Sequence, residues 1–221
     1  MNYKSILNLI GLLLAIFSFA FIPPLIVTFI YKEPLSEIFL YSFLFLISLG
    51  GLMWFISRQK GLPLNISDGF IITTMFWIVL ACAGSIPFYF FGLSFNDAIF
   101  ESVSGITTTG ATLIVGLDDL PKSLLLYRQL LQWIGGMGLI ILAVAVMPAL
   151  GIGGSQLYKM ELPGSHGNQK LTPKITDSAK ALWKIYFGLT LACALLYILA
   201  GMDLFDAIAH SLSTVAGGGF S

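Results

Sequence analysis

The sequence predicts an all-α, polytopic membrane protein, and three observations carry this prediction. The chain has 221 residues, of which 57% are hydrophobic and only 10% charged, whereas about 25% of the residues of a soluble domain are charged. Five apolar runs reach the length of about 20 residues that is needed to cross a bilayer. One stretch of fourteen residues also occurs twice, beginning at position 97 and again at position 206. Membrane proteins are often built from internal repeats of this kind.

The first predicted span, Ser5–Ile30, follows a lysine and could be mistaken for a signal peptide. It is too long for the apolar core of a signal peptide and further spans follow it, so we expect it to be retained. Pro23 and Pro24 should kink or end this helix near one face of the membrane. The other predicted transmembrane helices are Ser36–Ser57, Asp68–Phe91, Leu124–Met147 and Ala179–Ala200.

The basic residues favour an orientation with the N-terminus in the cytoplasm, because cytoplasmic loops of membrane proteins carry an excess of lysine and arginine. In this orientation only Lys32 and Lys122 lie outside, with Arg128 just within a span. Both copies of the repeated stretch then enter from the outer face. The basic residues on or next to the cytoplasmic side are Lys4, Arg58, Lys60, Lys159, Lys170, Lys174, Lys180 and Lys184.

The repeat pairs Asp97–Gly110 with Asp206–Gly219 without a gap. Six of the fourteen positions are identical, among them the first aspartate, two serines and the final glycine. Each copy follows an apolar helix. We therefore expect a two-helix N-terminal extension (1–66), a first repeat unit (67–150), a cytoplasmic linker (151–177) and a second unit that stops at its Gly-rich stretch (178–221).

Each copy predicts a short helix that enters the membrane only halfway. Asp97–Gly105 would form a helix of about 15 Å, which is roughly half the thickness of a bilayer. Ser94 is the expected N-cap of this helix, and Asp203 repeats that cap in the second copy. The stretch that follows, Ile106–Thr112, is too polar to face lipid. Irregular backbone at that depth is tolerated where it lines water or is buried in protein, so we predict two re-entrant pore loops in helix–pore-loop–helix units.

Backbone carbonyls on such loops can replace the water shell of a dehydrated cation. The second copy has no threonine in Val215–Gly219, so carbonyls are better candidates for ligands than hydroxyls. Glycine suits a position that needs a positive φ or a close approach to a neighbour. The candidate filter residues are Thr107, Thr108, Thr109, Gly110, Ala216, Gly217, Gly218 and Gly219, with ligand carbonyls at Thr108, Thr109, Gly217 and Gly218.

Acidic residues on the short helices are candidates for a supporting role. Asp97 and Asp206 place negative charge near the N-termini of the two helices, where it is favourable. Glu101 either attracts cations to the mouth of the loop or braces the loop backbone through hydrogen bonds, and both alternatives stay open.

Two further features of the spans have structural interpretations. Arg128 lies a few residues into the fourth span, so we expect it to snorkel outward and meet Asp118 or Asp119. The two cysteines, Cys82 and Cys193, lie inside apolar helices. A disulfide or a metal site is therefore not expected there, and close packing of small residues is.

Several other functions are disfavoured. The formal net charge is zero, so the chain offers no basic surface for nucleic acid. Gly151–Gly154 lacks the lysine and serine that a phosphate-binding loop requires. Ser104 and His210 superficially suggest the dyad of an intramembrane serine hydrolase, but Ser102 stands where the glycine of such a signature belongs.

Four motifs resemble one known family. Ser104–Thr112, Val115–Asp118, Tyr127–Gly138 and Gly151–Gly154 closely resemble the membrane subunits of bacterial Trk potassium uptake systems (TrkH/TrkG), in the wider Trk/Ktr/HKT superfamily. The resemblance covers essentially the whole chain. It implies four fused helix–pore-loop–helix units around one pore, with Gly110 and Gly219 as the filter glycines of the first two units.

The resemblance also implies an activity and partners. A member of this family would carry K⁺ across the bacterial inner (cytoplasmic) membrane without a cofactor, as a homodimer in the lipid bilayer with a cytosolic nucleotide-binding regulatory subunit similar to TrkA. Channel-like transport and coupling to H⁺ or Na⁺ both stay open. Against that template the chain stops at the second filter segment, so we expect a fragment that is inactive alone. The alternative is a non-conducting membrane fragment that binds partners.

Overall fold

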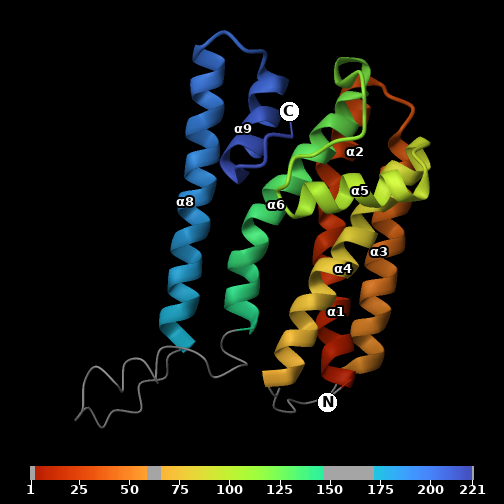
Figure 1. Cartoon of the computed structure of the whole chain (residues 1–221), viewed down its shortest axis with the longest axis vertical. Helices are drawn as coiled ribbons and strands as arrows, with labels where there is room; N and C mark the ends of the chain where they lie inside the picture. The colour runs from red at the N-terminus through yellow and green to blue at the C-terminus, as the bar shows by residue number, and fades with distance from the viewer. Residues whose placement is uncertain (1–2, 59–65, 147–171, 221) are drawn as a thin grey trace.

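The structure, a computed structural model, describes residues 3–58, 66–146 and 172–220 (Figure 1), with side chains at 3–58, 71–138 and 180–220. These described residues form helices, turns and loops without a strand, which confirms the predicted all-α class. The elements are α1 (Tyr3–Ser18), the 3-10 turn η1 (Phe19–Phe21), α2 (Ile22–Tyr31), α3 (Ser36–Ser57), α4 (Ile66–Phe91), α5 (Phe95–Ile106), the 3-10 turn η2 (Leu117–Asp119), α6 (Lys122–Val146), α8 (Thr172–Leu199) and α9 (Leu204–Ala216).

Among the described residues, four helical segments are long and apolar enough to cross a membrane. They coincide with the first, second, third and fifth predicted spans, and their bounds are Tyr3–Tyr31, Ser36–Ser57, Ile71–Phe91 and Lys180–Leu199. The fourth predicted span is helix α6, whose side chains are described only as far as Gly138. The chain is therefore a multi-pass membrane protein.

The first span is interrupted but not ended by its prolines. The 3-10 turn η1 separates α1 from α2, and ten further helical residues follow it. Pro23 has no backbone N–H to donate to the preceding turn, which favours a local tightening of the helix. The α-helix is thus interrupted next to the two prolines, whereas the prediction that it could end there is wrong, since helical residues continue to Tyr31.

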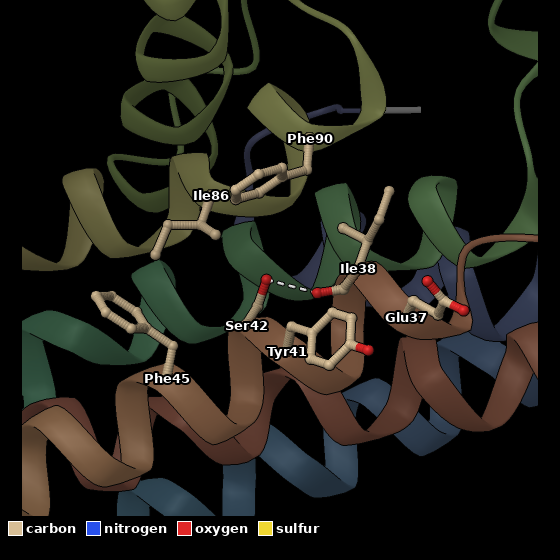
Figure 2. A pocket seen from close by; sticks show the side chains of 7 residues that line it. All are labelled: Glu37, Ile38, Tyr41, Ser42, Phe45, Ile86 and Phe90. Atoms are coloured by element: carbon tan, nitrogen blue, oxygen red, sulfur yellow. Dashed lines mark hydrogen bonds between the residues drawn. The ribbon is translucent and has the colours of Figure 1, made fainter.

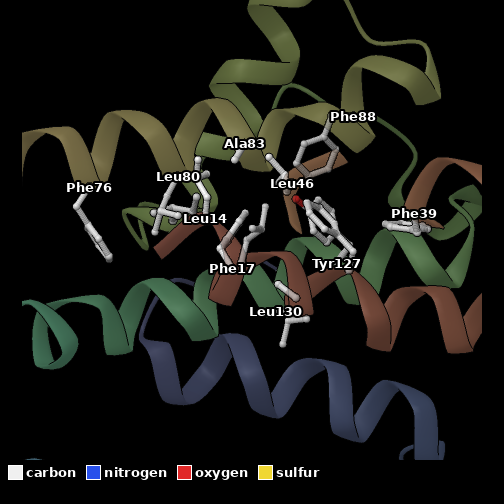
Figure 3. Packing of buried hydrophobic residues seen from close by; sticks show 14 of the residues in the cluster. Leu14, Phe17, Phe39, Leu46, Phe76, Leu80, Ala83, Phe88, Tyr127 and Leu130 are labelled. Atoms are coloured by element: carbon white, nitrogen blue, oxygen red, sulfur yellow. The ribbon is translucent and has the colours of Figure 1, made fainter. Parts of the chain in front are cut away.

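Tyr127 lies at the centre of a hydrophobic cluster contributed by α1, α3, α4 and α6 (Figure 3). Its ring is fully buried and has the rings of Phe21, Phe39 and Phe88 at centroid distances of 5.6, 5.6 and 5.3 Å. A buried tyrosine hydroxyl needs a polar partner, and that of Tyr127 donates to the carbonyl of Gly84 at 2.8 Å. This cluster joins the N-terminal helices to the first repeat unit.

Glu33 ties the N-terminal helices to the beginning of α6. Its carboxylate accepts hydrogen bonds from the backbone N–H groups of Lys122 at 2.7 Å and Ser123 at 3.2 Å, and from the Ser123 hydroxyl. The first N–H groups of a helix have no partner within the helix and favour a negative charge. The Lys122 ammonium in turn lies 4.5 Å from the ring centroid of Tyr31 and 4.9 Å from that of Phe205.

Helix α6 lies between the two short helices. The first of them, α5, packs on α4 and α6, whereas α9 packs on α6 and α8. In Figure 1 the N-terminus lies at one end of the long axis and the C-terminus lies beside α9, toward the other end. The two copies of the repeat therefore flank one shared helix.

Candidate functional site

The two copies of the repeat begin with the same kind of cap. The Ser94 hydroxyl accepts a hydrogen bond from the N–H of Asp97 at 3.2 Å at the start of α5. At the start of α9, the Asp203 carboxylate accepts one from the N–H of Phe205 at 3.2 Å. Both predicted N-caps are confirmed, and they occupy equivalent positions of the repeat.

The backbone after each short helix makes the same turn. The N–H groups of Thr108 and Thr109 donate to carbonyls in the last turn of α5, and those of Gly217 and Gly218 do the same at the end of α9. The donor–acceptor distances are 3.0 Å for Thr108 to Gly105, 3.0 Å for Thr109 to Ser104, 3.0 Å for Gly217 to Thr214 and 3.2 Å for Gly218 to Ser213. The duplication in sequence is therefore a duplication of backbone hydrogen bonds.

The signs of φ also repeat. Thr108 and Gly110 have φ values of 57° and 76°, and their counterparts Gly217 and Gly219 have values of 73° and 64°. The residue between each pair has a negative φ. A positive φ at a β-branched residue such as Thr108 is rare and marks a position held by its surroundings. These four residues are among the predicted filter residues.

The two predicted filter segments touch one another although they are far apart in the sequence. A Cβ atom placed on Gly110 would overlap the carbonyl oxygen of Gly218. The close approach requires glycine at position 110, as does the positive φ. The structure thus brings Thr107–Gly110 and Ala216–Gly219 together.

The remaining predicted filter residues lie at the ends of the short helices. Thr107 is the C-cap that follows α5, and its hydroxyl donates to the Val103 carbonyl at 2.7 Å. The same hydroxyl lies 2.7 Å from that of Thr109. Ala216 is the last residue of α9.

Glu101 is fully buried behind the first segment. One carboxylate oxygen accepts hydrogen bonds from the Thr112 hydroxyl at 2.5 Å and from the N–H of Leu113 at 2.7 Å. The other oxygen lies 3.4 Å from Nε and 3.4 Å from Nη2 of Arg128. The carboxylate is therefore directed at the backbone that follows Gly110.

The prediction that Arg128 reaches outward to Asp118 or Asp119 is wrong. Its side chain is 1% exposed and forms an ion pair with Glu101. It also donates to the Thr112 hydroxyl at 2.9 Å. A buried carboxylate on α5 meets this charge inside the protein, so the guanidinium does not need water.

Gln132 is a buried residue that the sequence analysis did not single out. Its side-chain oxygen accepts a hydrogen bond from the N–H of Phe220 at 3.0 Å. Its side-chain nitrogen has no partner among the described residues and lies against Gly218. Its position four residues after Arg128 on the same helix was the available signal, because such residues share a helix face.

The two supporting aspartates occupy different surroundings. Asp97 accepts a hydrogen bond from the Ser94 hydroxyl at 2.7 Å and belongs to the cap of α5. Asp206 is exposed in the first turn of α9, where it lines a cavity of about 120 Å³ together with Asp118 and Gln129.

A larger cavity, of about 490 Å³, lies between α3 and α4, away from the repeats (Figure 2). Its lining is mainly apolar, with Glu37 toward one end. The Ser42 hydroxyl in it donates to the carbonyl of Ile38 at 2.7 Å and is not free to act on a ligand. This cavity offers no set of groups for cation binding.

The suggested Ser–His dyad finds no support in the geometry. The Ser104 hydroxyl donates to the carbonyl of Ala111 at 2.6 Å, and the His210 ring lies edge-on to Tyr197 at a centroid distance of 6.4 Å. Within the described ranges, no cluster of three or more His, Cys, Asp or Glu side chains could hold a metal ion.

The structure has helices of membrane length, two helices of about half that length, and a matched turn after each of the two short helices. This arrangement defines a polytopic membrane protein of the pore-loop class. The family model TrkH, described as "Cation transport protein", matches residues 35–221. The chain belongs to this family, and the resemblance predicted from its motifs is confirmed.

The relatives agree over the whole chain. It is 52% identical over 224 residues to the Trk system potassium uptake protein TrkH of Vibrio parahaemolyticus, covering 100% of this chain and 46% of that protein. It is 48% identical to TrkH and 45% identical to TrkG of Escherichia coli strain K12, with the same coverage. The chain thus spans about half the length of the curated relatives it matches.

A solved structure supports the fold. The crystal structure of the potassium transporter TrkH from Vibrio parahaemolyticus superposes on this chain with a TM-score of 0.85 at 49% sequence identity. The match covers 100% of this chain and 44% of that one.

Proposed function

We propose that this chain supplies two filter segments of a pore through which K⁺ enters the cell. The observation that carries the proposal is the matched pair of turns, in which positive φ recurs at Thr108 and Gly110 and again at Gly217 and Gly219. The named activity of its relatives, potassium uptake, supports it.

The proposed ligands are the backbone carbonyls of Thr108, Thr109, Gly217 and Gly218. In an ordinary strand, successive carbonyls point to opposite sides. Positive φ at every second residue departs from that strand geometry, and the filters of K⁺ channels use rings of backbone carbonyls that face the ion. Such a row of carbonyls can replace the hydration shell of K⁺, and its number and field strength bear on the choice between K⁺ and Na⁺.

The assembly around these segments follows from the family. We propose four helix–pore-loop–helix units around one pore, in the bacterial inner membrane with the N-terminus in the cytoplasm. Residues 67–150 hold the first unit, and 178–221 hold the second as far as its filter segment. A homodimer and a cytosolic nucleotide-binding subunit similar to TrkA belong to the same proposal, and no cofactor beyond the transported ion does. Channel-like transport and transport coupled to H⁺ or Na⁺ are both compatible with this proposal.

A chimera tests the proposal, since the chain spans about half of its relatives. This chain replaces the segment of Vibrio parahaemolyticus TrkH with which it aligns, in cells that lack their own K⁺ uptake. We expect the chimera to restore growth at low K⁺. Gly110→Asp should abolish K⁺ uptake, because the added side chain would overlap the Gly218 carbonyl.

Gly51→Ser is the matched control, since a side chain at Gly51 on α3 would meet no described atom within 4 Å. It should leave uptake unchanged. If the chimera reaches the membrane and takes up no K⁺, or if Gly110→Asp transports as well as Gly51→Ser, the proposal is wrong.

A further inference from the structure

Helix α6 presents two buried polar side chains to the two filter segments. Arg128 and Gln132 are 1% and 0% exposed, and their spacing of four residues places them one above the other on one face of the helix. Burial of a charge and of an amide is unfavourable unless they are paired. The Arg128 guanidinium and the side-chain oxygen of Gln132 have partners, and these partners show which residues this face of α6 positions.

The first filter segment is held through Glu101. The carboxylate accepts hydrogen bonds from Thr112 and Leu113, which follow the filter glycine Gly110 by two and three residues. Arg128 binds both the carboxylate and the Thr112 hydroxyl. The guanidinium thus completes a hydrogen-bond network with Glu101 and Thr112, next to the C-terminal end of the first segment.

The second filter segment is held at Phe220, the residue after Gly219. The Phe220 ring centroid lies 4.0 Å from the guanidinium carbon of Arg128, within the range of a cation–π interaction. The backbone N–H of Phe220 donates to the side chain of Gln132 at 3.0 Å. One face of α6 therefore contacts both the ring and the backbone of Phe220, and so positions the end of the second segment.

We propose that Glu101, Arg128 and Gln132 form a clamp that sets the spacing of the two filter segments and thereby the preference for K⁺ over Na⁺. These three are positioning residues, since their hydrogen bonds and ring contact are made to Thr112, Leu113 and Phe220, the residues that follow the two segments. The proposal rests on the proposed function. It adds residues outside the filter to those that determine cation preference.

The chemistry of Arg128 explains why one residue can serve both segments. A planar guanidinium can bind a carboxylate along its edge and stack on a ring with its face, whereas a lysine ammonium is a point charge that cannot do both. Gly218 completes the arrangement, because a side chain there would collide with the Gln132 amide. The second segment and the Phe220 ring therefore pack directly against Gln132 and Arg128 of α6.

The test uses the same chimera, with K⁺ uptake measured against rising Na⁺ and each variant normalised to the amount of protein in the membrane. We expect Arg128→Lys and Gln132→Met to lower the preference for K⁺ over Na⁺ about tenfold, because misplacing a positioned group by roughly 1 Å can cost a hundredfold. Gln132→Met keeps the volume and adds no charge, so it tests the clamp even where an Arg128 variant fails to fold.

Gln129→Met is the matched control. Gln129 is also buried on α6, and its side-chain oxygen has no hydrogen-bond partner among the described residues. It should keep the ratio of the unmodified chimera. An unchanged ratio in Gln132→Met and Arg128→Lys, with normal uptake, would overturn the clamp alone. A chimera without K⁺ uptake would overturn the proposed function and the clamp with it.

Discussion

Thr108 holds a backbone conformation that β-branched residues seldom adopt, with φ at 57°. A left-handed conformation costs about 1–2 kcal/mol at a residue with a side chain. Two backbone hydrogen bonds to the end of α5, from Thr108 and Thr109, fix the turn in spite of this cost. The counterpart in the second copy is Gly217, which adopts the conformation freely. The strain is therefore local to the first filter segment.

Glycine positions in the two segments should respond differently to the same small substitution. In this chain, Gly110→Ala meets both an unfavourable φ and the carbonyl of Gly218, whereas Gly219→Ala meets the φ alone, because no described atom lies within 4 Å of its Cβ position. We expect Gly219→Ala to lower the free energy of unfolding by about 1–2 kcal/mol and Gly110→Ala to lower it further. Thermal unfolding of the purified chain in detergent measures both, and equal losses would contradict the observed contact.

Sequence patterns predicted residues with local partners and missed those whose partners lie on another helix. Ser94 and Asp203 could be predicted as caps because the backbone N–H groups that donate to their side chains lie two or three residues further along the chain. The sequence predicts that Arg128 snorkels outward to Asp118 or Asp119, because its real partner, Glu101, is 27 residues away. Hydropathy does not show which side of the helix that carries Glu101 faces Arg128. Gln132 was missed for the same reason.

At the scale of elements, hydropathy predicted well the four spans found among the described residues, because each is a long and continuous apolar stretch. The interruption at η1 was located only roughly, since the two prolines fix where a backbone N–H is missing but not how the neighbouring turns adjust. The short helices α5 and α9 were predicted from the duplication. Their shared packing on α6 was not, because a repeat indicates equivalence and not contact.

The contact between α1 and α3 depends on two glycines. A Cβ on Gly50 would lie 2.6 Å from the carbonyl oxygen of Gly11, and one on Gly11 would lie 2.8 Å from that of Gly50. Small residues at such crossings let membrane helices approach closely. We expect Gly50→Val to force the helices apart and to lower stability by about 1–3 kcal/mol.

The neighbouring Gly51→Val provides the comparison, since nothing described lies within 4 Å of its Cβ position. It should unfold at nearly the temperature of the unmodified chain in the same detergent. If Gly50→Val and Gly51→Val unfold at the same temperature, the close crossing of α1 and α3 does not contribute to stability.

At the scale of the whole molecule, α6 connects the three parts of the chain. Glu33, in the loop after α2, accepts a hydrogen bond from the first turn of α6. Gln132, in the middle of α6, accepts one from the residue that follows the second filter segment. The short helices α5 and α9 both pack on α6. These connections join residues separated by up to 90 positions. The sequence predicts that α6 is a membrane span, but its central place follows from tertiary contacts alone.

Glu33 is the residue that binds the N-terminal helices to this centre. Because its carboxylate meets two backbone N–H groups and the Ser123 hydroxyl at the start of α6, replacing it leaves donors at a helix N-terminus unpaired. We expect Glu33→Ala to lower the free energy of unfolding by roughly 1.5–3 kcal/mol, the range for hydrogen bonds to a charged group.

The matched control is Glu37→Ala, since Glu37 is exposed in the first turn of α3. Thermal unfolding in detergent compares the two, and a double variant with Ser123→Ala should lose less than the sum of the single changes, because the two side chains share one contact. Additive losses would show that the contact between Glu33 and the Ser123 hydroxyl does not contribute to stability.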